Sequence, residues 1–178
     1  NVNGFKACSI VGVGGACEVA ALSLALARHF ASNGVKTILV DLESQRSLIP
    51  DLMELPHAPG LAELLSGSAD FSKAIQRDRA SPLQFIRHGQ PNGNAEVQIP
   101  VRMEAITNTL KGIYDVVLLH TGEASPSLLQ AAKGCSTVLV HAAASRKKDA
   151  VAAIGTLKSN GFENVFLIQV EGVQQVAA

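Results

Sequence analysis

A glycine-rich turn, Gly12 to Cys17, reads GVGGAC between an apolar run and a helix-like stretch. Free backbone N–H groups and the helix dipole at such a turn attract anions, above all phosphate. A phosphate loop of the GxxxxGK[ST] type also needs a lysine for the terminal phosphates and a hydroxyl for magnesium. If Gly15 is its last glycine, Ala16 and Cys17 take those two places, and Ile10 takes the place of the first glycine. The turn therefore keeps an anion-binding backbone but lacks the charge, the hydroxyl and part of the length.

Two carboxylates, Asp41 and Glu43, follow the next apolar run, Val35 to Val40. A fixed negative charge at this point could hold a hydrated magnesium ion or accept a proton as a general base. The alternative is a solvated pair at a strand end with Arg46 as its partner. Two carboxylates with no other support favour that alternative.

His120 ends the apolar run that begins at Tyr114. Phosphate-loop enzymes use an aspartate at this strand end to hold magnesium, and a histidine, neutral or positive near pH 7, does not replace it. A locally hydrogen-bonded histidine is the simpler interpretation, since Cys17 and His120 together make only two ligands of a zinc site. Gln169, in the last apolar run, stands where a side chain could read a nucleotide base, although an exposed polar residue is the commoner explanation.

These residues need elements that place them, and the sequence supplies alternating strand-like and helical stretches. Continuously apolar strands are typical of a sheet covered by helices on both faces, and βαβ alternation predicts a doubly wound, mainly parallel α/β sheet. Ligands bind at the carboxyl ends of such strands. The expected strands are Lys6–Val11, Val35–Val40, Leu83–Arg87, Tyr114–His120, Thr137–Ala142 and Val165–Val170, and the expected helices are Ala16–Ser32, Val101–Lys111, Ser125–Lys133 and Lys147–Asn160.

Composition bounds the class of protein. The 178 residues are 47% hydrophobic and carry 15 basic and 15 acidic side chains, which predicts one packed domain over residues 1–178. A pI near 7.1 gives no field that would gather nucleic acid. The apolar stretch Val19 to Ala27 is far shorter than the roughly 20 residues of a membrane span. Three cysteines without a CxxC pair predict reduced thiols, and a start at Asn1 predicts a piece excised from a longer protein.

Several segments resemble one family closely. They are PGLAELLSGSAD and SPLQFIRHG within Val35–Gln90, followed by YDVVLLHTGEASPS and STVLVHAAASRKKDAVAAIGTLKSNG. In order and spacing they are similar to the cytoplasmic domain of bacterial tyrosine autokinases that accompany exopolysaccharide chain-length proteins, relatives of the MinD and ParA ATPases. The resemblance implies a P-loop NTPase-like fold, ATP-dependent protein tyrosine kinase activity, and a parent protein at the cytoplasmic side of the bacterial inner membrane.

The chain departs from the family at the chemical positions. The resemblance places a phosphate-loop lysine at Ala16, a magnesium-binding hydroxyl at Cys17, and a strand-end aspartate at His120. It places a base-site asparagine at Gln169 and two motif carboxylates at Asp41, which is kept, and Glu43. The resemblance also implies a tyrosine-rich tail; these 178 residues hold no such cluster, and Tyr114 is the one tyrosine among them.

The cost of these changes predicts a pseudokinase with degenerate Walker-type motifs. Losing one lysine and two magnesium-linked contacts removes roughly 4.5–9 kcal/mol at about 1.5–3 kcal/mol per charge-assisted hydrogen bond. That weakens binding about a thousand- to a million-fold. We expect no catalytic residue, no bound metal and no cofactor, with ATP and magnesium bound weakly at most. The expected partners are chain-length and export proteins or further copies of this chain.

Two alternatives stay open. Gly12 and Gly14 with Asp41 partly match the dinucleotide-binding GxGxxG pattern, which would make an NAD-dependent enzyme. However, Cys17 takes the place of the third glycine, and Asp41 lies 29 positions after Gly12 where about 20 is usual. The other alternative is nucleotide binding without turnover by the backbone at Gly14 and Gly15.

Overall fold

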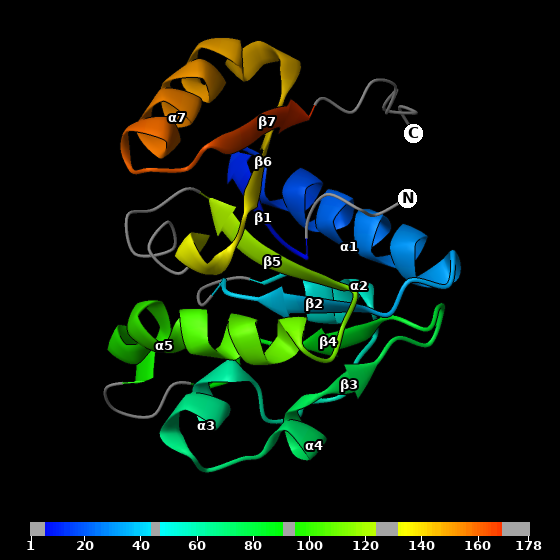
Figure 1. Cartoon of the computed structure of the whole chain (residues 1–178). Coiled ribbons are helices and arrows are strands. Elements are labelled where there is room, and N and C mark those ends of the chain that lie inside the picture. Colours follow the sequence, from blue (N-terminus) through cyan, green and yellow to red (C-terminus); the bar gives the residue numbers. More distant parts are fainter. Residues whose placement is uncertain (1–5, 44–46, 91–94, 124–131, 169–178) are drawn as a thin grey trace.

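The computed structural model describes residues 6–43, 47–90, 95–123 and 132–168. Its elements follow the βα alternation of the sequence (Figure 1). In chain order they are β1 (Ala7–Val13), α1 (Ala16–Ser32), β2 (Thr37–Asp41), α2 (Ile49–Leu52), α3 (Leu61–Ser66), α4 (Phe71–Ala74), β3 (Gln76–Arg77), β4 (Gln84–Ile86), α5 (Ala95–Lys111), β5 (Val116–Glu123), the 3-10 turn η1 (Ala132–Gly134), β6 (Thr137–Ala142), the 3-10 turn η2 (Ala144–Arg146), α7 (Lys147–Ser159) and β7 (Asn164–Ile168).

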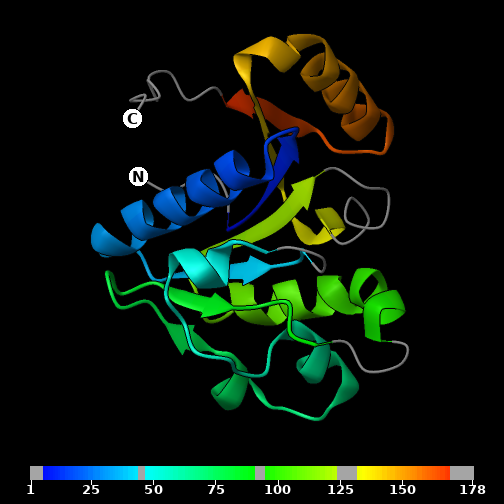
Figure 2. The ribbon, with the colours of Figure 1, turned by 180° about the vertical axis from the view of Figure 1, so that it is seen from behind.

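One sheet runs through the molecule in the order β3-β4-β2-β5-β1-β6-β7. Only β3 is antiparallel to its neighbour among the described strands, which confirms the mainly parallel sheet. Helices α1 and α2 cover one face, and α3, α5 and α7 cover the other (Figures 1 and 2). The side chains of β1 alternate between the two layers: Cys8 and Ile10 pack under α1, whereas Ala7 and Val11 belong to the opposite face.

The predicted elements differ from the observed ones in three respects. The sequence did not predict α2, α3 and α4, or the two-residue strand β3. Helix α5 begins at Ala95, six residues before the predicted start at Val101. The predicted helix 125–133 lies mostly outside the described residues, as does the end of the last predicted strand.

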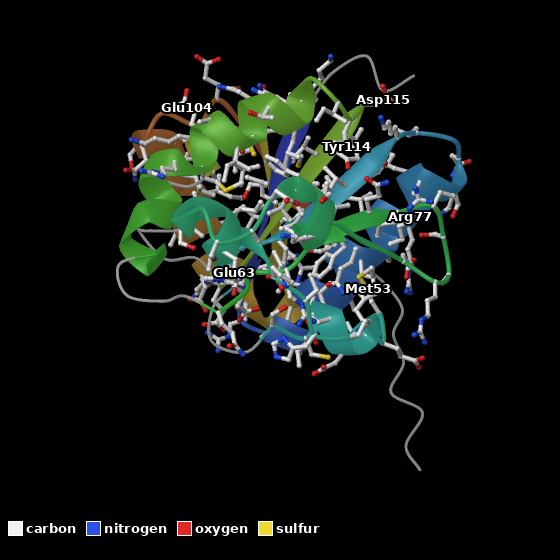
Figure 3. The ribbon with its side chains drawn as sticks, turned by 90° about the horizontal axis from the view of Figure 1, so that it is seen from below. Met53, Glu63, Arg77, Glu104, Tyr114 and Asp115 are labelled. Carbon is white, nitrogen blue, oxygen red and sulfur yellow. The ribbon has the colours of Figure 1, made fainter. Side chains whose placement is uncertain are left out.

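Tyr114 is buried just before β5 (Figure 3), where its hydroxyl donates to Gln84 Oε1. Lys36 Nζ lies 5.4 Å from the centre of its ring. The tyrosine is therefore part of the core. No helix in the described ranges combines the length and the apolar character that crossing a membrane requires.

Candidate functional site

The glycine-rich turn joins β1 to α1 as predicted. Gly14 and Gly15 have φ angles of 70° and 84°, a left-handed conformation that strains any residue with a Cβ. Gly15 is also the N-cap of α1. The two glycines are required by the backbone of this turn, and the first turn of the helix follows directly.

Charged side chains lie against both glycines. A Cβ built on Gly14 would come within 3.2 Å of Arg146 Nε, and one built on Gly15 within 3.1 Å of Glu18 Oε2. Arg146 lies just before α7, and its Nη1 donates to Asp149 Oδ2 at 3.1 Å. The loop is thus flanked by a cation and a carboxylate of its own chain.

Asp41, the last residue of β2, is fully buried. Its Oδ1 accepts from the backbone N–H of Glu43 at 3.0 Å, and its Oδ2 accepts from the hydroxyl of Ser47. Burial raises the pKa of Asp41 to about 6, although nearby His120 and these hydrogen bonds act in the opposite direction. The interpretation of Asp41 as half of a solvated pair is therefore wrong, because the strand end is covered. The proposed partner, Arg46, lies outside the described residues.

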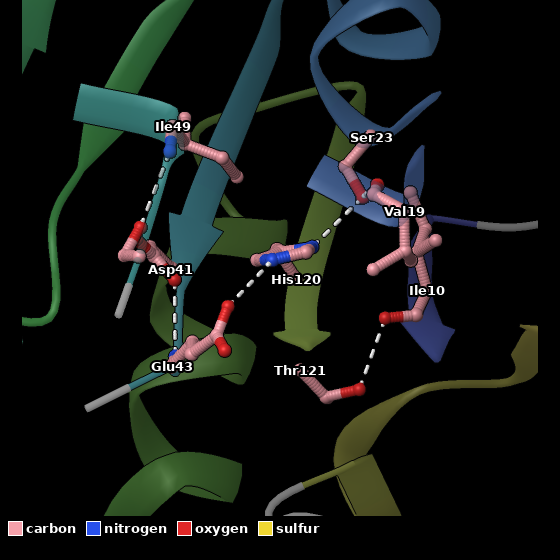
Figure 4. Close-up of polar contacts among 9 residues, drawn as sticks. Ile10, Val19, Ser23, Asp41, Glu43, Ile49, His120 and Thr121 are labelled. Carbon is pink, nitrogen blue, oxygen red and sulfur yellow. Dashed lines mark hydrogen bonds and ion pairs between the residues drawn. The ribbon is translucent and has the colours of Figure 1, made fainter. Parts of the chain in front are cut away.

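His120 lies at the centre of a buried polar network (Figure 4). Its Nδ1 is 2.9 Å from Ser23 Oγ, and its Nε2 is 3.4 Å from Glu43 Oε2. The second distance is that of an ion pair; Nε2 makes no hydrogen bond of normal geometry. His120 is therefore hydrogen-bonded within the protein, as the simpler interpretation predicted, and its partner Ser23 lies 97 residues away along the chain.

The sheet register brings these strand ends together. Asp41 pairs with His120 across β2 and β5, and Ile10 pairs with His120 across β1 and β5. The hydroxyl of Thr121 donates to the carbonyl oxygen of Ile10 at 3.0 Å and ties β5 to β1 (Figure 4). Asp41, Glu43 and His120 therefore form one cluster, whereas Cys17 is exposed on the first turn of α1 and Gln169 lies outside the described residues.

Sequence reasoning missed the residues that complete this cluster. Ser23 gave a usable signal, because it is the one hydroxyl inside the apolar stretch Val19 to Ala27. Ser47 and Thr121 gave none, since a hydroxyl near a strand end is common. The approach of Arg146 to Gly14 depends on the packing of β6 beside β1 and has no local sequence signature.

The residues present do not fit a magnesium ion. Glu43 faces His120, and both oxygens of Asp41 accept hydrogen bonds from the chain. Ala16 and Cys17 offer neither the lysine charge nor the hydroxyl that a magnesium–phosphate site uses. Within the described ranges, no three His, Cys, Asp or Glu side chains gather closely enough to hold a metal ion.

Among the cavities lined by described residues, three of about 660, 410 and 360 Å³ lie away from this cluster. The largest is lined by Lys6 and Lys111, and the next by Lys133 and Glu163, with Cys135 shared between them. The smallest adjoins His57 and Glu63. None of the three is lined by the glycine-rich turn.

No protein-family model matches the chain. EpsB of Ralstonia nicotianae, a candidate tyrosine-protein kinase by its name, is 29% identical over 101 residues, which are 56% of this chain and 13% of EpsB. Tyrosine-protein kinase CpsD of Streptococcus pneumoniae is 29% identical over 102 residues, 56% of this chain and 44% of CpsD. The chain thus spans less than half the length of these relatives.

Solved structures with the same fold cover nearly the whole chain. The kinase domain of the Escherichia coli tyrosine kinase ETK gives a TM-score of 0.81 at 20% identity over 97% of this chain and 71% of that one. The septum site-determining protein MinD of Pyrococcus horikoshii, complexed with Mg-ADP, gives 0.76 at 17% identity over 96% and 72%. The predicted resemblance is confirmed: over about 100 residues this chain is similar to bacterial tyrosine-protein kinases, and it has the MinD-like fold of P-loop ATPases.

Proposed function

We propose that this chain is a catalytically inactive, kinase-like module of an exopolysaccharide biosynthesis and export system. It works by docking on chain-length or export proteins, or on further copies of itself, at the cytoplasmic side of a bacterial inner membrane. One observation carries the proposal. The strand end at which a phosphate-loop enzyme holds magnesium is occupied by His120, which engages Glu43 at 3.4 Å and Ser23 at 2.9 Å.

Electrostatics supports the loss of catalysis. Phosphoryl transfer depends almost entirely on positioned cations that stabilise charge on the transferred group. Here Ala16 carries no charge, Cys17 no hydroxyl, and the nearby carboxylates are engaged by the protein itself. The intact sheet and the retained glycine turn support a role that keeps the shape of a kinase domain without its reaction.

Calorimetry with ATP and magnesium tests the inactive state. We expect no micromolar binding and no hydrolysis by the natural chain. A triple variant, Ala16→Lys, Cys17→Ser and His120→Asp, returns the lysine, the hydroxyl and the carboxylate, so its affinity for ATP should rise at least a hundredfold. Replacing His120→Asp by His120→Asn in the same background is the matched control. Micromolar binding with hydrolysis by the natural chain contradicts the proposal.

The docking role is tested separately by sedimentation velocity. The chain is measured alone over a hundredfold concentration range, and then with the cytoplasmic segments of the chain-length protein from the same bacterium. A complex with either partner is the expected result. A monomer under all these conditions contradicts docking, whatever the result with ATP.

A second candidate function, nucleotide binding without turnover, is favoured by the guanidinium of Arg146 at Gly14. This cation lies beside a loop whose own lysine is missing. If Arg146 holds phosphate, ADP in the presence of a chelator should bind weakly. Arg146→Ala should abolish the heat of ADP binding, while Lys148→Ala leaves it unchanged.

The NAD-dependent alternative has no such support. The sheet order separates β1 from β2 by β5, whereas the first two strands of the dinucleotide-binding order are neighbours.

A further inference from the structure

The hydrogen bonds of Ser23 fix one proton of His120. Ser23 Oγ lies 2.8 Å from the carbonyl oxygen of Val19 and 2.9 Å from His120 Nδ1. A carbonyl oxygen only accepts, and a hydroxyl has a single hydrogen to give. The Ser23 hydrogen therefore goes to Val19, and Nδ1 must carry a hydrogen and donate it to Ser23.

The other ring nitrogen faces a carboxylate. Nε2 of His120 lies 3.4 Å from Glu43 Oε2, and the imidazole is fully buried. With the hydrogen of a neutral ring already on Nδ1, Nε2 would present a lone pair to the carboxylate oxygen, and two acceptors at this distance repel. A second proton between Nε2 and Oε2 turns that repulsion into a charge-assisted contact.

The charged groups around His120 are carboxylates, which favour a positive charge on the imidazole. Two carboxylates, Asp41 and Glu43, approach His120 from the β2 side. The elements on its other sides contribute Ser23 and Val19 from α1, and Ile10 from β1, and none of these titrates. Within the described part of the chain, no lysine or arginine forms an ion pair with either carboxylate. Among the described residues, a neutral His120 would leave neither carboxylate with a cationic partner.

We infer that the doubly protonated imidazole of His120 is the resident cation of this site, in the place of a divalent metal. Ser23 orients the ring, and the charge holds Glu43. The inference deepens the proposed function and rests on it in treating the site as free of metal.

The backbone at Gly122 fixes the carboxylate on its other side. A Cβ built on Gly122 would come within 2.7 Å of Glu43 Cδ and 2.9 Å of Oε2, so the carboxylate packs directly on this glycine. Glu43 is therefore enclosed between His120 and Gly122. The Glu43 side chain is 17% exposed, and Oε2 is the oxygen that lies 3.4 Å from the imidazole.

Nitrogen-15 NMR of the histidine side chains at pH 7 tests the protonation, with His120 assigned by the loss of its signals in His120→Gln. We expect both ring nitrogens to resonate as protonated, and Glu43→Gln to return Nε2 to the unprotonated range. An unprotonated Nε2 in the natural chain overturns the inference. It leaves the proposed function standing if ATP still fails to bind.

Manganese binding, followed by electron paramagnetic resonance, tests the exclusion of metal. The natural chain should not bind millimolar Mn²⁺. His120→Asp, which exchanges the cation for a third carboxylate, should bind Mn²⁺ at least tenfold more tightly than the matched His120→Asn. Binding by the natural chain, or equal binding by the two variants, overturns the inference. The NMR comparison with Glu43→Gln decides the matter if either His120 variant fails to fold.

Discussion

Arg28 holds the buried carboxylate of Asp78 through two hydrogen bonds of 2.9 Å, from Nε to Oδ2 and from Nη2 to Oδ1. Arg28 lies in the second half of α1, and Asp78 directly follows β3. Asp78 Oδ2 also accepts from the hydroxyl of Ser81 at 2.7 Å. The pair therefore ties the helix that starts at the glycine-rich turn to the far edge of the sheet.

Asp78→Ala should destabilise the protein by about 2–4 kcal/mol, because it leaves the guanidinium and the Ser81 hydroxyl without their shared acceptor. Urea unfolding at pH 7 measures the loss. The control is Asp149→Ala, which removes a similar Arg–Asp contact of 3.1 Å at an exposed site and should have little effect. Equal losses in the two variants would contradict the importance of burial.

Glu63 joins the start of α3 to the end of β4. Its Oε2 accepts from the backbone N–H of Gly60 at 2.7 Å, and its Oε1 accepts from that of Gln90 at 2.9 Å. Burial acts to raise the pKa of Glu63, but these backbone hydrogen bonds outweigh it and hold the pKa below its usual range. These two hydrogen bonds to the charged carboxylate therefore stabilise the fold near neutral pH. That stabilisation is lost as the pH falls through the pKa of Glu63 in the folded state.

Glu63→Gln should cost nearly as much stability as Glu63→Ala, about 1–3 kcal/mol, because an amide offers one acceptor oxygen and its NH₂ group faces the second N–H. Unfolding free energies at pH 7 and pH 4 test both variants. The difference between the natural chain and either variant should shrink at the lower pH. A difference that is constant across this range would show that the carboxylate charge plays no part.

Asp41 gives the opposite dependence on pH. Burial raises the pKa of its carboxyl from 3.8 to about 6, so folding favours the protonated form. Ionising Asp41 lowers the free energy of unfolding. This loss is absent below the unfolded pKa of 3.8, grows as the pH rises from there to the folded pKa of about 6, and is complete above it. At about 1.4 kcal/mol per pKa unit, this corresponds to about 3 kcal/mol.

Asp41→Asn should therefore stabilise the protein above pH 6 and lose that advantage near pH 4. Urea unfolding from pH 4 to pH 8 measures the difference from the natural chain. Asp51→Asn, on the exposed side of α2, is the control and should show no such change. A variant that is less stable than the natural chain at pH 7 would contradict the assigned cost of burying this carboxylate.

The sequence predicted the elements whose signals are local. Helix α1 has its predicted bounds, Ala16–Ser32, because Gly15 and the pair Asn33-Gly34 mark its two ends. Helix α3, in contrast, depends on a distant part of the chain. Its first N–H groups donate to the carbonyl oxygens of Arg87 and His88, at 2.8 and 2.9 Å. A six-residue helix held by a distant strand end is not predictable from its own residues.

The candidate site was likewise predicted only in part from the sequence. The glycine turn, Asp41, Glu43 and His120 were predicted as strand-end residues, because parallel strands bring their carboxyl ends to one edge. Their hydrogen-bond partners were not predicted, because the contact of Ser23 with His120 joins residues that are 97 positions apart in the sequence. The burial of Asp41 was missed for a related reason. Ser47, which donates a hydrogen bond to it, lies in the segment between β2 and α2, whose sequence has no periodic pattern.

Gly60, in the segment PGLAELL, has no room for a side chain. A Cβ at this position would lie 2.3 Å from the carbonyl oxygen of Arg87 and 2.6 Å from the backbone nitrogen of Gly89. Both obstacles are backbone atoms, so no side chain can rotate away. Gly155, within α7, has nothing within 4 Å of such a Cβ. The two glycines therefore have different reasons to be present.

Gly60→Ala should destabilise the protein by at least about 2 kcal/mol, because the end of β4 must move away from α3. Gly155→Ala should instead stabilise it by about 0.5–1 kcal/mol, through the lower entropy cost of alanine in a helix. Thermal and urea unfolding of the two variants measure both effects against the natural chain. A stable Gly60→Ala would mean that α3 can leave the end of β4 at little cost, and Glu63→Ala would then also have to be nearly neutral.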